Sequence, residues 1–268
     1  MAEDRKSETI RQLFFLNLIK EIDAFFAARK VPLWILKGPA IGYRYYESPE
    51  KRVYTDIDLF VESGNWEKSL QALKDMGGKA TNPKKWYGSD FRCVFIFQGF
   101  PVEIHRQLLV ERPMDYMFVK ESRPCQIPGI HWMREPCTED LFVYLCGHGA
   151  FQHLFDDIQW LYDLNLLLIK EKNNFDWEKL AKRSEMMRLN TAVGVTLVLL
   201  EKFYGHKIGL KAPIGNWLLR KISPIYLKPE RLRKQKHLKP HFIYLLYKAL
   251  MRDSLGEAFY YGLKRISQ

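Results

Sequence analysis

Hydrophobic and polar residues in the first half of the chain follow two periodicities. Helices are predicted where apolar residues recur every three or four positions, over residues 7–29, 39–47 and 65–76. Strands are predicted where short apolar or alternating runs occur, over residues 33–36, 55–61, 91–97 and 101–108. The last two runs flank Gln98-Gly99-Phe100, a short glycine-containing link that is typical of a β-hairpin.

The second half of the chain carries helical periodicity only. Apolar residues follow the 3.6-residue spacing over 137–150, 158–172, 177–187 and 191–204, and a helical pattern returns between 213 and 268. This change predicts an α+β fold with two domains. The N-terminal domain, over 1–127, holds the strands, and the domain over 128–268 is all-helical.

Composition narrows the class of protein. The chain has 268 residues, of which 47% are hydrophobic and 14% aromatic, and this excludes disordered and collagen-like chains. No apolar stretch approaches the ~20 residues of a membrane span, and the charged start lacks a secretory-signal pattern. The four cysteines form no Cys-x-x-Cys pair. We therefore expect a cytoplasmic protein with free thiols and no membrane contact.

Positive charge is concentrated in one part of the chain. The formal net charge is +11, and the segment from Glu201 to Pro240 holds eleven Lys or Arg residues against two acids. The densest part, 228–239, must lie at the surface, because unpaired charges are costly to bury. A solvated face and a contact with a polyanion such as RNA both fit this pattern.

The basic segment 228–239 gives a prediction that separates these two interpretations. If it contacts RNA, binding weakens by about 0.7–0.9 log unit per phosphate contact for each tenfold rise in salt. Replacing its residues Arg231, Arg233, Lys234 and Lys236 together by Ser then cuts RNA binding steeply. Mobility shifts against a tRNA pool at two salt concentrations test this, and a solvated face would give no shift even at low salt.

Two acidic residues lie two positions apart in the predicted strand 55–61. Side chains at this spacing share one face of a strand, so Asp56 and Asp58 point the same way while Ile57 and Leu59 point into the core. Adjacent carboxylates repel unless a cation lies between them. Oxygen ligands at this spacing suit Mg²⁺, which keeps several waters and accepts phosphate oxygens. The alternative is an exposed strand end whose acids face water.

Neighbouring segments point to phosphate chemistry around this acidic pair. The preceding strand leads through Lys37-Gly38-Pro39 into a helix, whose free N–H groups favour a phosphate, and Lys37 adds a full charge. Glu103 and His105 share one face of the second hairpin strand. A third carboxylate beside the acidic pair would complete a two-metal site for in-line phosphoryl or nucleotidyl transfer.

These residues resemble the nucleotidyltransferase superfamily of the DNA polymerase β type, in which a strand, a glycine turn and a helix precede the Asp-x-Asp strand. Three segments more narrowly resemble a bacterial family described only as uncharacterised nucleotidyltransferases: LKGPAIGYRYYESPEKRVYTDIDLFV, VEIHRQL and HGAFQHLFDDIQWLYDLNLLL. The resemblance runs from about Leu33 to Leu168. It implies that residues 1–127 form a polymerase β-like catalytic domain, with a mixed sheet and flanking helices.

The resemblance also implies a role for each motif residue. Asp56 and Asp58 are implied to be metal ligands, and Glu103 the third carboxylate, which activates the acceptor hydroxyl. Gly38 corresponds to the glycine of the phosphate loop. The superfamily usually has Gly-Gly or Gly-Ser there, but here a proline follows the glycine. Because no hydroxyl is available, we expect Lys37 to bind the triphosphate instead.

Three further residues have two interpretations each. Arg52 either contacts the triphosphate or is a solvated loop arginine. His105 either binds the acceptor or a substrate phosphate, or is a structural histidine. His148 either lines an acceptor pocket or packs between helices.

The predicted function is transfer of a nucleoside monophosphate, dependent on Mg²⁺ or Mn²⁺, from an NTP such as ATP to a hydroxyl or phosphate of an acceptor. The acceptor is a small molecule, a peptide or RNA. The alternative is a non-catalytic module of the same fold that binds RNA or an acidic partner. The presence of all three carboxylates favours the enzyme. Since like charges repel, replacing any one carboxylate by its amide is expected to leave the protein no less stable.

Overall fold

The computed structural model describes residues 2–81, 91–109, 120–153, 155, 157–206, 250–254 and 256. The chain divides into two compact units, Met1–Cys137 and Thr138–Gln268. The sequence placed the domain boundary between residues 127 and 128. The first unit extends further because Arg134–Pro136 forms a strand, β7, that pairs with the first strand of the sheet. The basic segment 228–239 lies outside the described residues.

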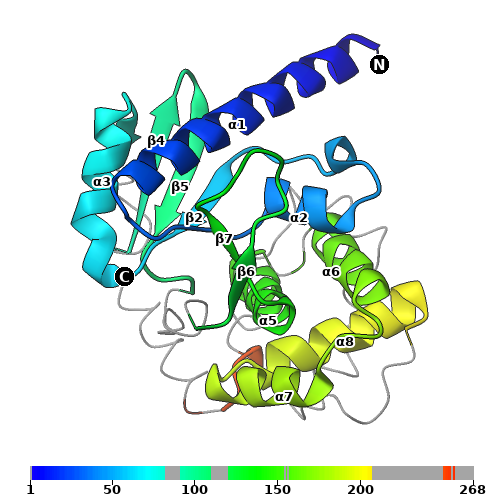
Figure 1. Cartoon of the computed structure of the whole chain (residues 1–268). Coiled ribbons are helices and arrows are strands. Elements are labelled where there is room, and N and C mark those ends of the chain that lie inside the picture. Colours follow the sequence, from blue (N-terminus) through cyan, green and yellow to red (C-terminus); the bar gives the residue numbers. More distant parts are fainter. Residues whose placement is uncertain are drawn as a thin grey trace. The chain divides into compact units, whose positions relative to one another are not determined.

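Within the described residues, the first unit is built on a seven-stranded sheet in the order β3-β4-β5-β2-β1-β7-β6. Figure 1 shows β4 and β5 side by side, with β2 next to β5. Strand β2 runs parallel to β5 and antiparallel to β1, which in turn runs parallel to β7. The predicted mixed sheet with flanking helices is therefore confirmed. The strands are β1 (Trp34–Ile35), β2 (Ile57–Phe60), β3 (Lys79–Thr81), β4 (Arg92–Phe97), β5 (Phe100–His105), β6 (Ser122–Pro124) and β7 (Arg134–Pro136).

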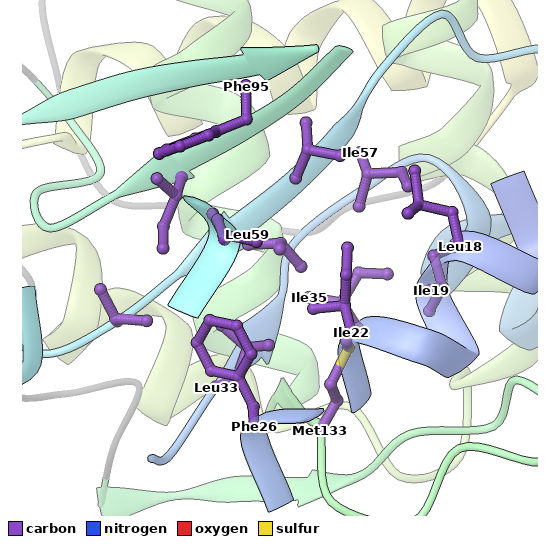
Figure 2. Packing of buried hydrophobic residues seen from close by; sticks show 14 of the residues in the cluster. Leu18, Ile19, Ile22, Phe26, Leu33, Ile35, Ile57, Leu59, Phe95 and Met133 are labelled. Atoms are coloured by element: carbon purple, nitrogen blue, oxygen red, sulfur yellow. The ribbon is translucent and has the colours of Figure 1, made fainter. Parts of the chain in front are cut away.

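The hydrophobic core lies between one face of this sheet and the helices α1 (Ala2–Ala28) and α3 (Trp66–Asp75). Figure 2 shows Ile19 and Ile22 of α1 packed toward Ile57 and Leu59 of β2. All four side chains are fully buried. Because strand residues two apart share a face, this packing commits the remaining residues of β2 to the opposite face of the sheet.

The hairpin of β4 and β5 closes through a tight turn. Gln98 has φ +50° and Gly99 has φ +90°, the paired positive values that match a two-residue turn to the twist of its strands. The turn fixes the register, which pairs Phe97 with Phe100 and, five residues further back, Arg92 with His105. The predicted hairpin is confirmed.

In the part of the second unit that the structure describes, the regular elements are helices joined by short links, and each helix agrees with a predicted one to within a few residues. Two helices begin at an aspartate whose carboxylate accepts a backbone N–H: Asp157 from Gln159, and Asp176 from Lys179. Among the described residues, no helix combines the length and the apolar character needed to cross a membrane. The helices are α5 (Thr138–His148), α6 (Ile158–Lys170), α7 (Trp177–Met186) and α8 (Asn190–Tyr204), with a π-helical turn at Gly149–His153.

Candidate active site

The loop between β1 and the seven-residue helix α2 (Pro39–Tyr45) turns at a glycine. Gly38 has φ +57° and ψ −116°, a conformation that residues with a side chain rarely adopt. A Cβ at this position would lie 3.5 Å from the carbonyl oxygen of Asp56. The loop therefore runs close against the segment that leads into β2, and it places Lys37 beside that strand.

Asp58 lies in β2 on the face opposite the hydrophobic core. Its side chain is only 3% exposed, and each of its oxygens has a partner. The Nζ atom of Lys37 lies 3.0 Å from Oδ2, and Nε2 of His105 lies 3.3 Å from Oδ1. For Asp58, the alternative of an exposed strand end whose acids face water is therefore wrong.

Strand β5 brings Glu103 and His105 to the same face of the sheet. The parallel register places Glu103 directly beside Asp58. The Nε2 atom of His105 lies 3.5 Å from Oε2 of Glu103, and a guanidinium nitrogen of Arg92 lies 3.1 Å from the same oxygen. Two carboxylates that are 45 residues apart in the sequence thus meet on adjacent strands.

The two aspartates of the motif differ in their electrostatic surroundings. Burial and the charge of Asp58 raise the pKa of Asp56 to about 6; Glu103 adds to this shift, while Lys37 and His105 oppose it. Burial also acts to raise the pKa of Asp58, but the Lys37 ammonium and the hydrogen bond with His105 outweigh burial and hold this pKa at about 2. The negative charge of Asp58 is compensated by its two direct partners, whereas Lys37 and His105 offset only part of the effect of burial and of the neighbouring carboxylates on Asp56.

This arrangement fits a divalent cation. Asp58, Glu103 and His105 each offer a ligand atom, and these atoms lie within 4.8 Å of one another. Carboxylate oxygens are donors that both Mg²⁺ and Mn²⁺ accept, whereas the imidazole nitrogen suits a transition-metal ion and not Mg²⁺. The sequence placed Asp56 among the ligands and left His105 open as a contact of the acceptor or a substrate phosphate, or as a structural histidine. The group that the structure brings together contains His105 and does not include Asp56, so metal binding by Asp56 stays a prediction.

Arg52 is buried, so the interpretation as a solvated loop arginine is wrong. Its side chain donates to the carbonyl oxygen of Val53 at 2.7 Å, and only 5% of the residue is exposed. A Cβ at Gly42 would lie 3.3 Å from Cβ of Arg52, which shows how tightly the residue packs against α2. Its contact with a triphosphate stays a prediction.

His148 belongs to the second unit, at the end of α5. Its buried ring lies 5.7 Å from the ring of Tyr144, 4.8 Å from that of His153 and 5.0 Å from that of Trp160, between ring centroids. Packing between aromatic side chains accounts for this position, and binding of the acceptor stays a prediction.

Arg92 is a site residue that the sequence interpretation missed. The signal for it was present in the hairpin, because a two-residue turn at Gln98-Gly99 sets the register that places Arg92 opposite His105. Paired residues share a face of the sheet, and Glu103 lies on the same face as His105, two positions earlier in β5. This register therefore places an arginine next to the carboxylate of Glu103.

Among curated proteins, none matches this chain. Two solved structures of ANT(2'')-Ia align with it at 17% sequence identity and a TM-score of 0.49. One is a solution structure of this antibiotic-resistance factor, where the alignment covers 72% of this chain and 99% of that one. The other is a crystal structure with adenylyl-2''-tobramycin, where it covers 65% and 97%. A family model described as uncharacterised nucleotidyltransferase matches residues 1–205, which include the sheet and helices α5 to α8.

Proposed function

The chain belongs to the family of uncharacterised nucleotidyltransferases, and from this premise we propose that it transfers a nucleoside monophosphate at the site formed by β2 and β5. An oxygen of the acceptor, from a hydroxyl or phosphate, attacks the α-phosphorus of an NTP. The bond between that phosphorus and the oxygen bridging to the β-phosphate breaks, and pyrophosphate leaves. The observation that carries the proposal is the convergence of Asp58, Glu103 and His105 on adjacent parallel strands.

Asp56, Asp58 and Glu103 are proposed to hold Mg²⁺ or Mn²⁺, with His105 as a further donor. The closeness of Asp58, Glu103 and His105 supports this assignment, and Asp56 precedes Asp58 by two residues on the way into the same strand. When bound, the cation neutralises charge on the triphosphate and at the reacting phosphorus.

Glu103 is proposed to receive the proton of an acceptor hydroxyl. The ion pair with Arg92 at 3.1 Å restricts the orientation of this carboxylate, which a proton acceptor needs in order to meet the attacking oxygen. His105 lies 3.5 Å from the same carboxylate. It is proposed to contact the acceptor in addition to the metal ion.

Lys37, Gly38 and Arg52 are proposed to bind the triphosphate. Lys37 supplies a full positive charge beside the carboxylates, and the backbone conformation of Gly38 keeps the loop close to β2. Arg52 lies buried against α2 in the same unit. A cationic side chain of this kind forms charge-assisted hydrogen bonds with phosphate oxygens.

Incubation with NTPs labelled at the α-phosphate, Mg²⁺ or Mn²⁺ and cell extract tests the proposal. We expect a labelled acceptor, and digestion of the product with nuclease or protease assigns it to RNA, a peptide or a small molecule. The Asp58→Asn variant is the control for labelling by enzymes of the extract. Equal labelling with the wild-type protein and this variant would reject the proposed function.

Replacing Lys37 by Ala is expected to raise the KM for the NTP by about tenfold or more. The reason is the loss of a charge-assisted hydrogen bond to the triphosphate, which is worth about 1.5–3 kcal/mol. Steady-state kinetics at saturating acceptor measure this change. An increase in the KM for the acceptor alone would show that the loop serves the acceptor and not the NTP.

A further inference from the structure

Both oxygens of Asp58 are already engaged by groups of the chain itself. Lys37 holds Oδ2 at 3.0 Å and His105 holds Oδ1 at 3.3 Å. The ion pair is shielded from water, since the side chains of Lys37 and Asp58 are 9% and 3% exposed. A cation of the protein therefore lies against the carboxylate that is proposed to bind a metal.

We propose that Lys37 is an internal counter-cation that competes with divalent cations for Asp58. When a nucleoside triphosphate binds, the lysine pairs with the triphosphate and leaves Asp58 to the metal ion. Metal alone then binds weakly, and metal and nucleotide bind together. This inference rests on the proposed function, because it requires a triphosphate at the same site.

The competition follows from charge and distance. A metal ion bound to a carboxylate lies about 2 Å from its oxygen, so an ion on Oδ2 of Asp58, which Lys37 contacts at 3.0 Å, would lie no more than about 5 Å from the ammonium. Two positive charges at that separation repel strongly where water is largely excluded. Binding of a metal ion to Oδ2 of Asp58 is therefore strengthened when the Lys37 ammonium leaves.

Lys37 is suited to such a movement. Its ammonium is a compact charge on a flexible four-carbon stem, which can exchange one anionic partner for another. The loop residue next to it, Gly38, is held against the segment before β2, so the side chain of Lys37 moves while its backbone stays in place. Arg92 remains paired with Glu103 at 3.1 Å and compensates that second carboxylate independently.

Calorimetric titration with Mn²⁺ alone, without nucleotide or acceptor, tests the inference. The neutral variants Lys37→Met and Lys37→Gln are expected to bind Mn²⁺ at least about tenfold more tightly than the wild type. Lys37→Arg keeps the charge and is expected to bind Mn²⁺ as weakly as the wild type. Lys51→Met removes an exposed lysine that pairs with Glu47 and is the matched control, with no expected change.

Thermal unfolding with and without Mn²⁺ gives a second measurement. Both neutral variants are expected to gain more in Tm from Mn²⁺ than the wild type does, because the metal replaces the missing counter-charge of Asp58. Lys37→Gln keeps a hydrogen-bond donor and serves as the folded variant if Lys37→Met does not fold.

Unchanged or weaker Mn²⁺ binding in the folded neutral variants would overturn the inference. The result is separable from that of the labelling experiment, because the Mn²⁺ titration needs no turnover. Label transfer without tighter Mn²⁺ binding would reject the counter-cation and retain the enzyme. Tighter Mn²⁺ binding without label transfer would instead show that Lys37 competes with metal at Asp58, while rejecting the proposed function.

Discussion

Replacing Asp58 by Asn is expected to lower the rate of nucleotidyl transfer by about a hundredfold to a thousandfold, the range seen when one electrostatic contact to a reacting group is lost. Asp58 is the least exposed carboxylate of the donor group, and Lys37 and His105 both contact it. The amide removes the charge that is proposed to hold the metal, and it also releases Lys37 from its position. Single-turnover labelling at saturating NTP measures the loss.

The matched control for this variant is Asp75→Asn. It makes the same chemical change at an exposed aspartate of α3 that pairs with Arg29 at 3.4 Å. We expect its transfer rate to equal that of the wild type. A rate for Asp58→Asn as high as that of this control would reject the assignment of the metal site.

Replacing Asp56 by Asn is expected to stabilise the metal-free protein at pH 8, by up to about 3 kcal/mol. Folding raises the pKa of Asp56 from 3.8 to about 6. The folded state therefore holds its proton more tightly, and stability is lost as the pH rises from 3.8 through 6. The amide carries no charge at any pH, so it avoids this loss. The gain is expected to disappear below about pH 4, where the wild-type carboxyl is neutral in both states.

Urea unfolding in EDTA at pH 4, 6 and 8 measures this dependence, and Asp58→Asn provides the contrast. The pKa of Asp58 is lowered from 3.8 to about 2, so its ionised form stabilises the fold above pH 3.8 and this contribution is lost as the pH falls through 2. Asp58→Asn should therefore destabilise the protein at pH 8. For Asp58, this replaces the expectation from the sequence that the amide leaves the protein no less stable. A loss of stability in Asp56→Asn at pH 8 would contradict the charge balance derived for the site.

The longer helices and strands were predictable from the sequence, and so was the face of the element on which each of their residues lies. The alternation in β2 places Ile57 and Leu59 in the core and Asp58 on the other face, as a strand requires. Three strands were not predicted: β3, β6 and β7. Each has only three residues, and β6 and β7 both contain proline. Such segments carry too little periodicity to be recognised, and β7 becomes a strand by pairing with β1, far away in the sequence.

The candidate site was predictable in its residue types but not in its pairings. Lys37 and Asp58 are 21 positions apart, and they meet because antiparallel pairing of β1 with β2 brings the loop after one strand beside the other. Spacing along a single strand contains no information on this contact. The role of His105 was open for the same reason, since its distance from Asp58 depends on the parallel register of β2 and β5.

Parallel incubations with NTP labelled at the α-phosphate and at the γ-phosphate test the central claim most directly, namely that this site transfers a nucleotidyl group. Both use the wild-type protein, Mg²⁺ and the same acceptor fraction. We predict that the acceptor takes up the α label and no γ label, with release of one pyrophosphate per α label incorporated. Uptake of the γ label would show phosphoryl transfer instead, and uptake of neither label under conditions where the protein is folded would contradict the account.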